Sequence, residues 1–193
     1  MSTNALNSIA NTWRRLLLEV ELAKHYTHTY LLHGGHALRD PLLDYLLPSL
    51  LYVKSLSVLD EALIAYIAQK GLAVPRRYHN SLHGRIEFLS DEGILSSRNA
   101  LLTIKDKRNN LAHEATTQVT WNDLDQAVNE IERALQSVGF VGTRPTYEFY
   151  AEKSALREST EPGILFTEDF CYGIKENGKR AIEVSWTSQV LAD

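Results

Sequence analysis

The stretch Leu51-Leu-Tyr-Val-Lys-Ser-Leu-Ser-Val-Leu-Asp-Glu-Ala-Leu-Ile-Ala-Tyr-Ile67 decides the predicted fold. It is apolar enough to form the central helix of a helical bundle. It is the second half of a helical stretch over about 41–70, which has Pro41 in its first turn and Gly71 just past its end. Pro48 should kink this stretch or split it in two.

Further helices are expected on both sides of this stretch, because apolar residues recur there at helical spacing. They cover about residues 8–32, 78–90, 97–112 and 120–138. Gly34-Gly35 should stop the first of them, and Ser96 or Ser97 is a plausible N-cap for the third. Thr120-Trp-Asn-Asp123 resembles a capping box at the start of the last.

After Gly139 the pattern changes from helical spacing to alternation. Residues 144–191 predict a small antiparallel sheet of two or three strands, with Asn177-Gly178 as a two-residue hairpin turn. The predicted fold is therefore mainly α. A bundle of four to five helices fills residues 1–139, and a small C-terminal antiparallel β appendage fills residues 140–193.

Composition narrows the class of protein. A single cysteine, Cys171, excludes an internal disulfide and a cysteine-rich zinc site, and it fits a reducing compartment. The first residues lack the pattern of a signal peptide, and no stretch is apolar for long enough to cross a bilayer, so we expect a cytoplasmic protein without membrane contact. The net charge is −4. However, residues 76–113 carry seven Lys/Arg against four Asp/Glu, whereas residues 114–193 carry seven against fourteen.

The basic excess surrounds the segment Lys105-Asp-Lys-Arg-Asn-Asn-Leu-Ala-His-Glu114. This segment resembles the active-site motif of HEPN domains, in which an arginine, usually followed by a polar residue, precedes a histidine by four to six positions. Arg108, Asn109 and His113 match that pattern, near the end of a late helix, as in the family. The resemblance implies a bundle fold and, in many members, a metal-independent ribonuclease of the toxin or phage-defence type that needs no cofactor and is held in check by an antitoxin or other partner.

The chemistry of RNA cleavage gives these residues their predicted roles. His113 would take the proton of the ribose 2′-hydroxyl, because an imidazole titrates near neutral pH. Arg108 would hold the phosphate, because a guanidinium keeps its charge and can bond two oxygens at once. Asn109 could orient the histidine or donate to the phosphate. RNA phosphates are also expected to bind four cations on and before this helix: Lys105, Lys107, Arg76 and Arg77.

The spacing of the motif raises a geometric condition. Residues five apart on an ideal helix differ by about 140° in azimuth, so Arg108 and His113 converge only if the helix ends or bends between them, or if a second chain supplies its own pair. The resemblance implies the second route, a homodimer whose two motifs line one cleft. The same cleft could instead belong to a non-catalytic module that binds a nucleotide, RNA or a protein, or to an oligomerisation scaffold.

Two plainer interpretations stay open. Arg108 could pair with Asp106 or Glu114, and His113 could cap a helix C-terminus, where the helix dipole favours a positive group.

The histidines at 25, 28, 33 and 36, together with Asp40 and Asp44, are candidate ligands for a metal ion. No recognised ligand pattern fits them, and solvated histidines are the preferred account, so no metal site is predicted.

Overall fold

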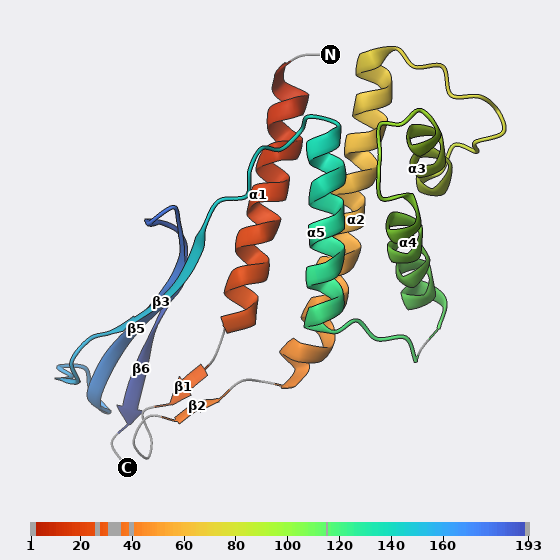
Figure 1. Cartoon of the computed structure of the whole chain (residues 1–193). Coiled ribbons are helices and arrows are strands. Elements are labelled where there is room, and N and C mark those ends of the chain that lie inside the picture. Colours follow the sequence, from red (N-terminus) through yellow and green to blue (C-terminus); the bar gives the residue numbers. More distant parts are fainter. Residues whose placement is uncertain (1–2, 26–27, 31–35, 39–40, 115, 192–193) are drawn as a thin grey trace. The chain divides into compact units, whose positions relative to one another are not determined.

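The computed structural model describes residues 3–25, 28–30, 36–38, 41–114 and 116–191 (Figure 1). The helices are α1 (Thr3–His25), α2 (Pro41–Lys70), α3 (Leu82–Asp91), α4 (Arg98–His113) and α5 (Trp121–Ser137). The strands are β1 (His28–Tyr30), β2 (His36–Leu38), β3 (Tyr147–Lys153), β4 (Arg157–Glu158), β5 (Ile164–Glu176) and β6 (Lys179–Leu191). None of the helices in these described ranges is long and apolar enough to cross a membrane.

The chain divides into two compact units. The first joins Met1–Leu16 to Asp44–Thr143 and holds most of the helices, and the second joins Leu17–Leu43 to Arg144–Asp193 and holds the strands. Helix α1 therefore contributes its first half to one unit and its second half to the other. Each unit has its own set of buried side chains.

The helical unit is built around side chains that are completely buried. They come from all five helices and include Trp13, Leu16, Leu56, Leu59, Leu63, Ile86, Leu89, Leu101, Leu124 and Ile131. Trp13 Nε1 donates to Glu132 Oε1 on α5 at 3.4 Å, which gives both buried polar groups a partner. Tyr52 Oη donates to the Ile104 carbonyl oxygen at 3.1 Å and ties α4 to α2.

The helix boundaries confirm some predictions and correct others. Helix α2 spans Pro41–Lys70 as one continuous helix with Pro48 inside it, so of the two outcomes predicted for Pro48, a kink or a split, the split does not occur. The left-handed Gly71, with φ of 61°, follows its last residue, as predicted. Thr120 and Asp123 form the predicted capping box, in which each backbone N–H donates to the other side chain, at 2.9 and 3.2 Å.

Two helices are shorter than predicted. The first ends at His25 rather than near residue 32, and β1 follows it. Thr29 and Tyr30 favour strands, which outweighs the helical spacing of the apolar residues before them. Helix α3 begins at Leu82, because Ser81 caps it by accepting from the Gly84 N–H at 3.2 Å. Gly34-Gly35, the predicted helix stop, lies outside the described residues.

The sheet of the second unit is antiparallel and has four strands. Strand β5 is central: β6 pairs with it along nearly its whole length on one side, and β3 and β4 pair with it on the other. Asn177 and Gly178 have φ of 49° and 76° and make the predicted two-residue turn between β5 and β6. A separate two-stranded sheet pairs β1 with β2.

One face of the larger sheet is lined by buried side chains. Alternate residues of β5, namely Phe170, Tyr172 and Ile174, are buried on one face, where Phe170 stacks on Trp186 with ring centroids 5.4 Å apart. His25 at the end of α1 stacks on Phe149 of the same face at 4.7 Å. The aromatic side chains on this face thus form much of the core of this unit.

The predicted fold class is wrong. The described residues form five helices and a four-stranded antiparallel sheet, so the chain is a mixed fold with a substantial sheet rather than a mainly α, HEPN-like bundle with a small β appendage. The predicted span of residues 144–191 agrees with strands β3 to β6, which lie between Tyr147 and Leu191, but the sheet has four strands rather than two or three. Its buried Glu168 is compensated by an ion pair with Lys153 at 3.3 Å. Strand β4 has only two residues, too few to show a period.

Candidate functional site on α4

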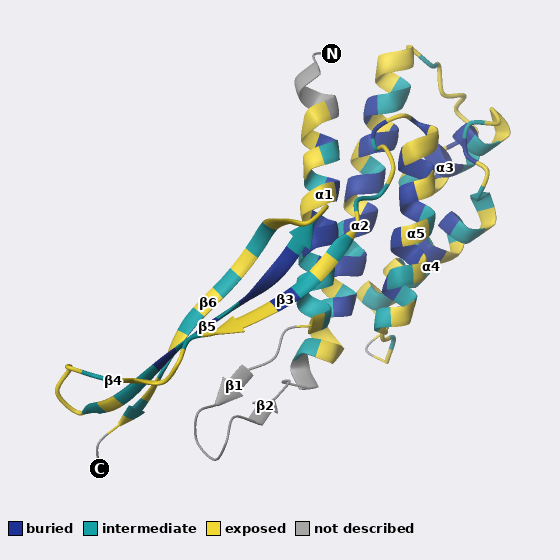
Figure 2. Cartoon of the chain, turned by 60° about the vertical axis from the view of Figure 1, so that its left-hand side comes forward, coloured by how far each residue is buried: buried dark blue, intermediate teal, exposed yellow. Residues whose placement is uncertain are grey.

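The motif lies on the last turns of α4, beyond the part of that helix that packs in the core. Leu101 and Ile104 are its buried residues, and each residue from Lys105 to His113 is half-buried or exposed (Figure 2). The helix continues without a break to His113, and the Glu114 N–H still donates to the Asn110 carbonyl at 2.7 Å. The core therefore holds the first half of α4 and leaves its polar end in solvent.

Arg108 has no carboxylate partner among the residues that the structure describes. Its Nη1 donates to Asn109 Oδ1 at 3.3 Å. The two acids that could have paired with it have other partners: Asp106 pairs with Lys105, and Glu114 accepts from the Thr117 hydroxyl at 2.9 Å. The guanidinium thus keeps its charge available for an external anion. Asn109 contacts the arginine rather than the histidine.

His113 is the last residue of α4 and is exposed. Within the described part of the chain its ring makes no hydrogen bond and no ion pair. Both ring nitrogens can therefore meet a substrate. None of the neighbouring residues that the structure describes fixes the orientation of the ring, so a substrate or a second protein surface would have to supply that constraint.

Arg108 and His113 do not share one side of α4. Because the helix is continuous between them, their azimuths differ by about 140°. The first condition for convergence, a helix that ends or bends between the two residues, is not met. A single chain therefore does not bring both groups onto one face.

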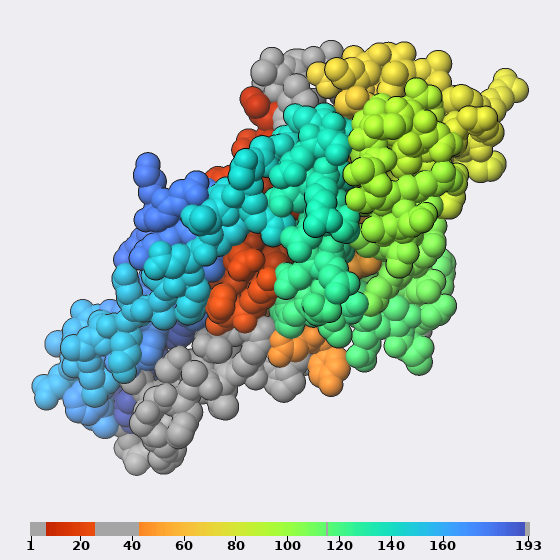
Figure 3. Space-filling view, viewed as in Figure 1, coloured from red at the N-terminus to blue at the C-terminus, as the bar shows by residue number. Residues whose placement is uncertain are grey.

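The two lysines near the motif have partners within the chain. Lys107 Nζ lies 2.7 Å from Asp123 Oδ1 at the start of α5, which runs beside α4 on the same face of the helical unit (Figure 3). Burial opposes the charge on Asp123, but bonds from Lys107 and Thr120 outweigh it and lower the pKa of this carboxyl to about 2. Lys105 pairs with Asp106, and its Nζ lies 3.5 Å from His83 Nδ1. An RNA phosphate would have to compete for both lysines.

Arg76 and Arg77 lie in the loop between α2 and α3. This loop is at one end of the helical unit, and the C-terminal end of α4 is at the other (Figure 1). Arg77 Nη2 donates to Tyr78 Oη at 2.6 Å, and its guanidinium lies over the Tyr78 ring. Arg76 lines a separate groove. The structure does not bring these two arginines to the motif of their own chain.

Metal coordination finds no support in the described ranges. They contain no group of three or more histidine, cysteine or acidic residues that could hold an ion. His33 and Asp40, two of the candidate ligands, lie outside the described residues.

Sequence reasoning missed Tyr52 and Asp123, which help to position α4. Both act through contacts with residues far away in the chain, at Ile104 and Lys107. The one signal available was the Thr120–Asp123 capping box, which indicated that Asp123 would be ionised at a helix start. Comparison with models of protein families, with curated proteins and with solved structures found no match for this chain.

Proposed function

We propose that this chain is a cytoplasmic, metal-independent endoribonuclease that uses Arg108 and His113 in a homodimer. One observation supports this function above the others: Arg108 and His113 are both presented by the solvated end of α4, and neither has a charged partner within the described residues. An arginine and a histidine kept in this state on a rigid helix suit phosphate binding and proton transfer. The resemblance of the segment to HEPN ribonuclease motifs points in the same direction.

The proposed reaction needs no cofactor. His113 takes the proton of a ribose 2′-hydroxyl, and the 2′-oxygen attacks the adjacent phosphorus. The bond from phosphorus to the 5′-oxygen breaks, and that oxygen takes a proton from a second imidazole or from water. Arg108 binds the non-bridging oxygens as charge builds on them. The products are a 2′,3′-cyclic phosphate and a 5′-hydroxyl.

A second copy of the chain is part of this proposal. Because Arg108 and His113 of one chain point away from one another around α4, the reacting pair is formed by Arg108 of one copy and His113 of the other. A two-fold axis beside the end of α4 would create two such pairs. Asn109 acts as a positioning residue, since its side-chain oxygen accepts from Arg108.

Cleavage of RNA by the purified full-length protein tests the proposal. Total RNA is incubated with the protein in EDTA, beside Arg108→Ala and His113→Ala, and the cleaved ends are analysed for cyclic phosphate. Arg133→Ala is the matched control, because Arg133 is an exposed arginine on α5 away from the motif. We expect the wild type and the control to cleave and the two motif variants to lose at least 100-fold in rate. Equal cleavage by all four proteins, or by none, contradicts the nuclease.

A second candidate function uses the same surface for binding and involves no RNA cleavage. Because Arg108 and His113 point to different sides of one helix, a monomeric chain would not bring them together for catalysis. A monomer is therefore expected to be a module that binds RNA or a protein but does not cleave. This alternative predicts RNA binding that Arg108→Ala weakens, together with intact RNA and a monomeric mass. Mass measurement by light scattering therefore separates the two functions independently of the cleavage assay.

A further inference from the structure

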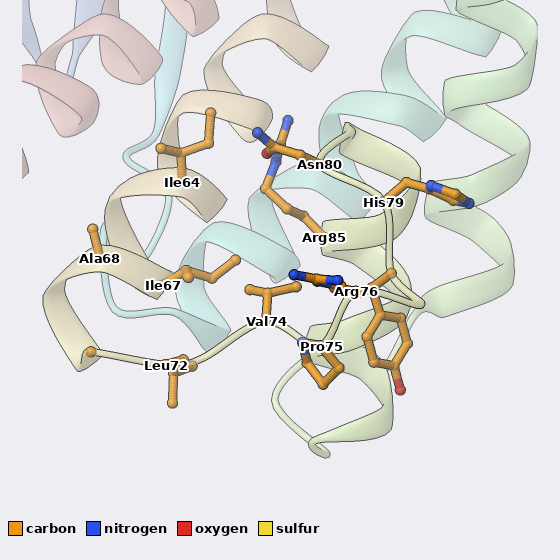
Figure 4. Close-up of a pocket in the computed structure, with 12 residues that line it drawn as sticks. Ile64, Ile67, Ala68, Leu72, Val74, Pro75, Arg76, His79, Asn80 and Arg85 are labelled. Carbon is orange, nitrogen blue, oxygen red and sulfur yellow. The ribbon is translucent and has the colours of Figure 1, made fainter.

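A groove lies at the end of the helical unit opposite the motif, between the C-terminal part of α2 and the loop that follows it (Figure 4). Its volume is about 960 Å³. Ile64, Ile67, Leu72 and Val74 form an apolar wall, and the lining also includes the side chains of Arg76 and Arg85. A cavity of this size holds a drug-sized molecule.

The loop that forms one wall is fixed by hydrogen bonds and packing. After the turn at Gly71, the Leu72 N–H donates to the Ile67 carbonyl at 3.0 Å. Tyr78 is buried against Phe88, and its hydroxyl donates to Asp91 Oδ2 at 2.6 Å. The loop also lies so close to α3 that a Cβ on Gly84 would be 2.2 Å from the His79 carbonyl oxygen. The groove is therefore largely preformed.

The two arginines of the groove differ in their available charge. Arg85 is buried, and its nitrogens donate to Asp60 Oδ1 at 2.6 and 2.9 Å and to Asn80 Oδ1 at 2.9 Å, so its charge is already compensated. Arg76 is exposed and has no hydrogen bond or ion pair with any residue that the structure describes. None of the described residues lining the groove is acidic. One uncompensated cation thus lies beside an apolar wall.

The apolar wall is unusually open to solvent. Ile64 is 50% exposed and Val74 is 37% exposed. In Figure 4 the Arg76 side chain extends above Val74 towards the α2 side of the groove, so its guanidinium lies along the apolar wall rather than away from it. A ligand that covers both the apolar wall and Arg76 would gain affinity from burial of its apolar surface and from a charge-assisted bond to the guanidinium.

We propose that this groove binds an amphipathic carboxylate, with the carboxylate on Arg76 and an aliphatic body against Ile64, Ile67 and Val74. A single available cation matches a single negative charge, whereas a nucleic acid would need several. The wall next to Arg76 is aliphatic, the ring of Tyr78 is packed against Phe88, and the His79 ring extends away from Arg76, so a base beside Arg76 would find no aromatic ring to stack on (Figure 4). This site is independent of the proposed nuclease and lies away from its residues.

Fluorescence titration of the full-length protein with 11-(dansylamino)undecanoic acid tests the site. We expect saturable binding that Arg76→Gln weakens about five- to tenfold, through loss of a charge-assisted bond. Ile64→Ser, at a half-exposed position, should weaken it by a similar factor through loss of apolar contact. The matched control Arg133→Gln makes the same charge change outside the groove and should leave binding unchanged. The methyl ester of the probe, which lacks the charge, should bind wild type as weakly as the acid binds Arg76→Gln.

Three outcomes overturn the proposal. The first is the absence of saturable binding by a wild-type protein whose circular dichroism shows it to be folded. The second is equal affinity for acid and ester together with no effect of Arg76→Gln. The third is an Arg76→Gln variant that binds the probe normally but binds single-stranded RNA more weakly, which would assign Arg76 to RNA. RNA cleavage by Arg76→Gln is measured in parallel, so that the outcome for the groove can be judged separately from the outcome for the proposed nuclease.

Discussion

Lys107 on α4 and Asp123 in the capping box of α5 form an ion pair, with 2.7 Å between Nζ and Oδ1. The same carboxylate accepts from the Thr120 N–H at 2.9 Å through its other oxygen. One side chain thus caps α5 and holds the α4 turn that precedes Arg108. The helix end that presents the motif is therefore fixed by a pairing between helices as well as by the core.

The pH dependence of stability follows from this pair. Asp123 has a pKa of about 2 in the folded protein, against an ordinary value of 3.8. A lowered folded pKa means that the stabilisation is complete above the unfolded value and is lost as the pH falls from about 4 towards 2. Because the carboxyl is partly exposed, we expect a contribution of about 1–2 kcal/mol. Urea unfolding of wild type and Asp123→Asn should differ by this amount at pH 7 and converge near pH 2, whereas a constant difference would contradict the ion-pair account.

The Tyr52 hydroxyl provides a second test of how α4 is held. Burial, and then the charge of Asp123, raises the pKa of Tyr52, so the phenol stays protonated and donates to the Ile104 carbonyl. Tyr52→Phe should lower the free energy of unfolding by about 1 kcal/mol, because it removes one buried hydrogen bond and little packing. Tyr45→Phe, at an exposed tyrosine of the same helix, is the control and should change stability by less than about 0.5 kcal/mol. Equal effects of the two substitutions would show that the bond contributes nothing.

Gly84 tests the close contact between α3 and the preceding loop. A Cβ at this position would lie 2.2 Å from the His79 carbonyl oxygen and 2.5 Å from that of Tyr78, both of them backbone atoms. Gly84→Ala should therefore destabilise the protein by about 2 kcal/mol or more and weaken binding of the dansyl probe, since the loop forms a wall of the groove. At Gly142 an added Cβ would meet nothing within 4 Å, so Gly142→Ala should change stability by about 0.5 kcal/mol at most. Thermal unfolding of both variants measures the contrast.

Mixing two inactive variants tests whether the reacting pair crosses the dimer. In a heterodimer of Arg108→Ala with His113→Ala, one composite site loses both residues and the other keeps both. Random exchange of subunits makes half of the dimers mixed, so the mixture should regain up to about a quarter of the wild-type RNA cleavage. An active pair formed within one chain would give no recovery. Arg108→Ala mixed with Arg108→Ala/His113→Ala is the control and should stay inactive.

Much of the helical unit could be predicted from local sequence. The apolar run from Leu51 to Ile67 and the capping box at Thr120 each depend on residues within a few positions of one another, and the structure contains both as predicted. The span of the sheet could also be predicted, but the number of its strands could not, because the two residues of β4 are too few to show a period. The burial of Glu168 in β5 likewise depends on a residue distant in the chain, since its charge pairs with Lys153 of β3.

The sequence by itself determined which chemical groups the candidate site contains. The order Arg108, Asn109 and His113, and the helix that carries them, are local properties of the chain. Only the tertiary structure decided which cations are paired and which are available to a ligand. Lys107 and Arg85 pair with Asp123 and Asp60, which lie 16 and 25 positions away in the chain. Those pairings leave Arg108 and Arg76 as available cations at opposite ends of the helical unit. Spacing along one helix cannot reveal which cation is already paired, since the pairing forms only when distant segments fold together.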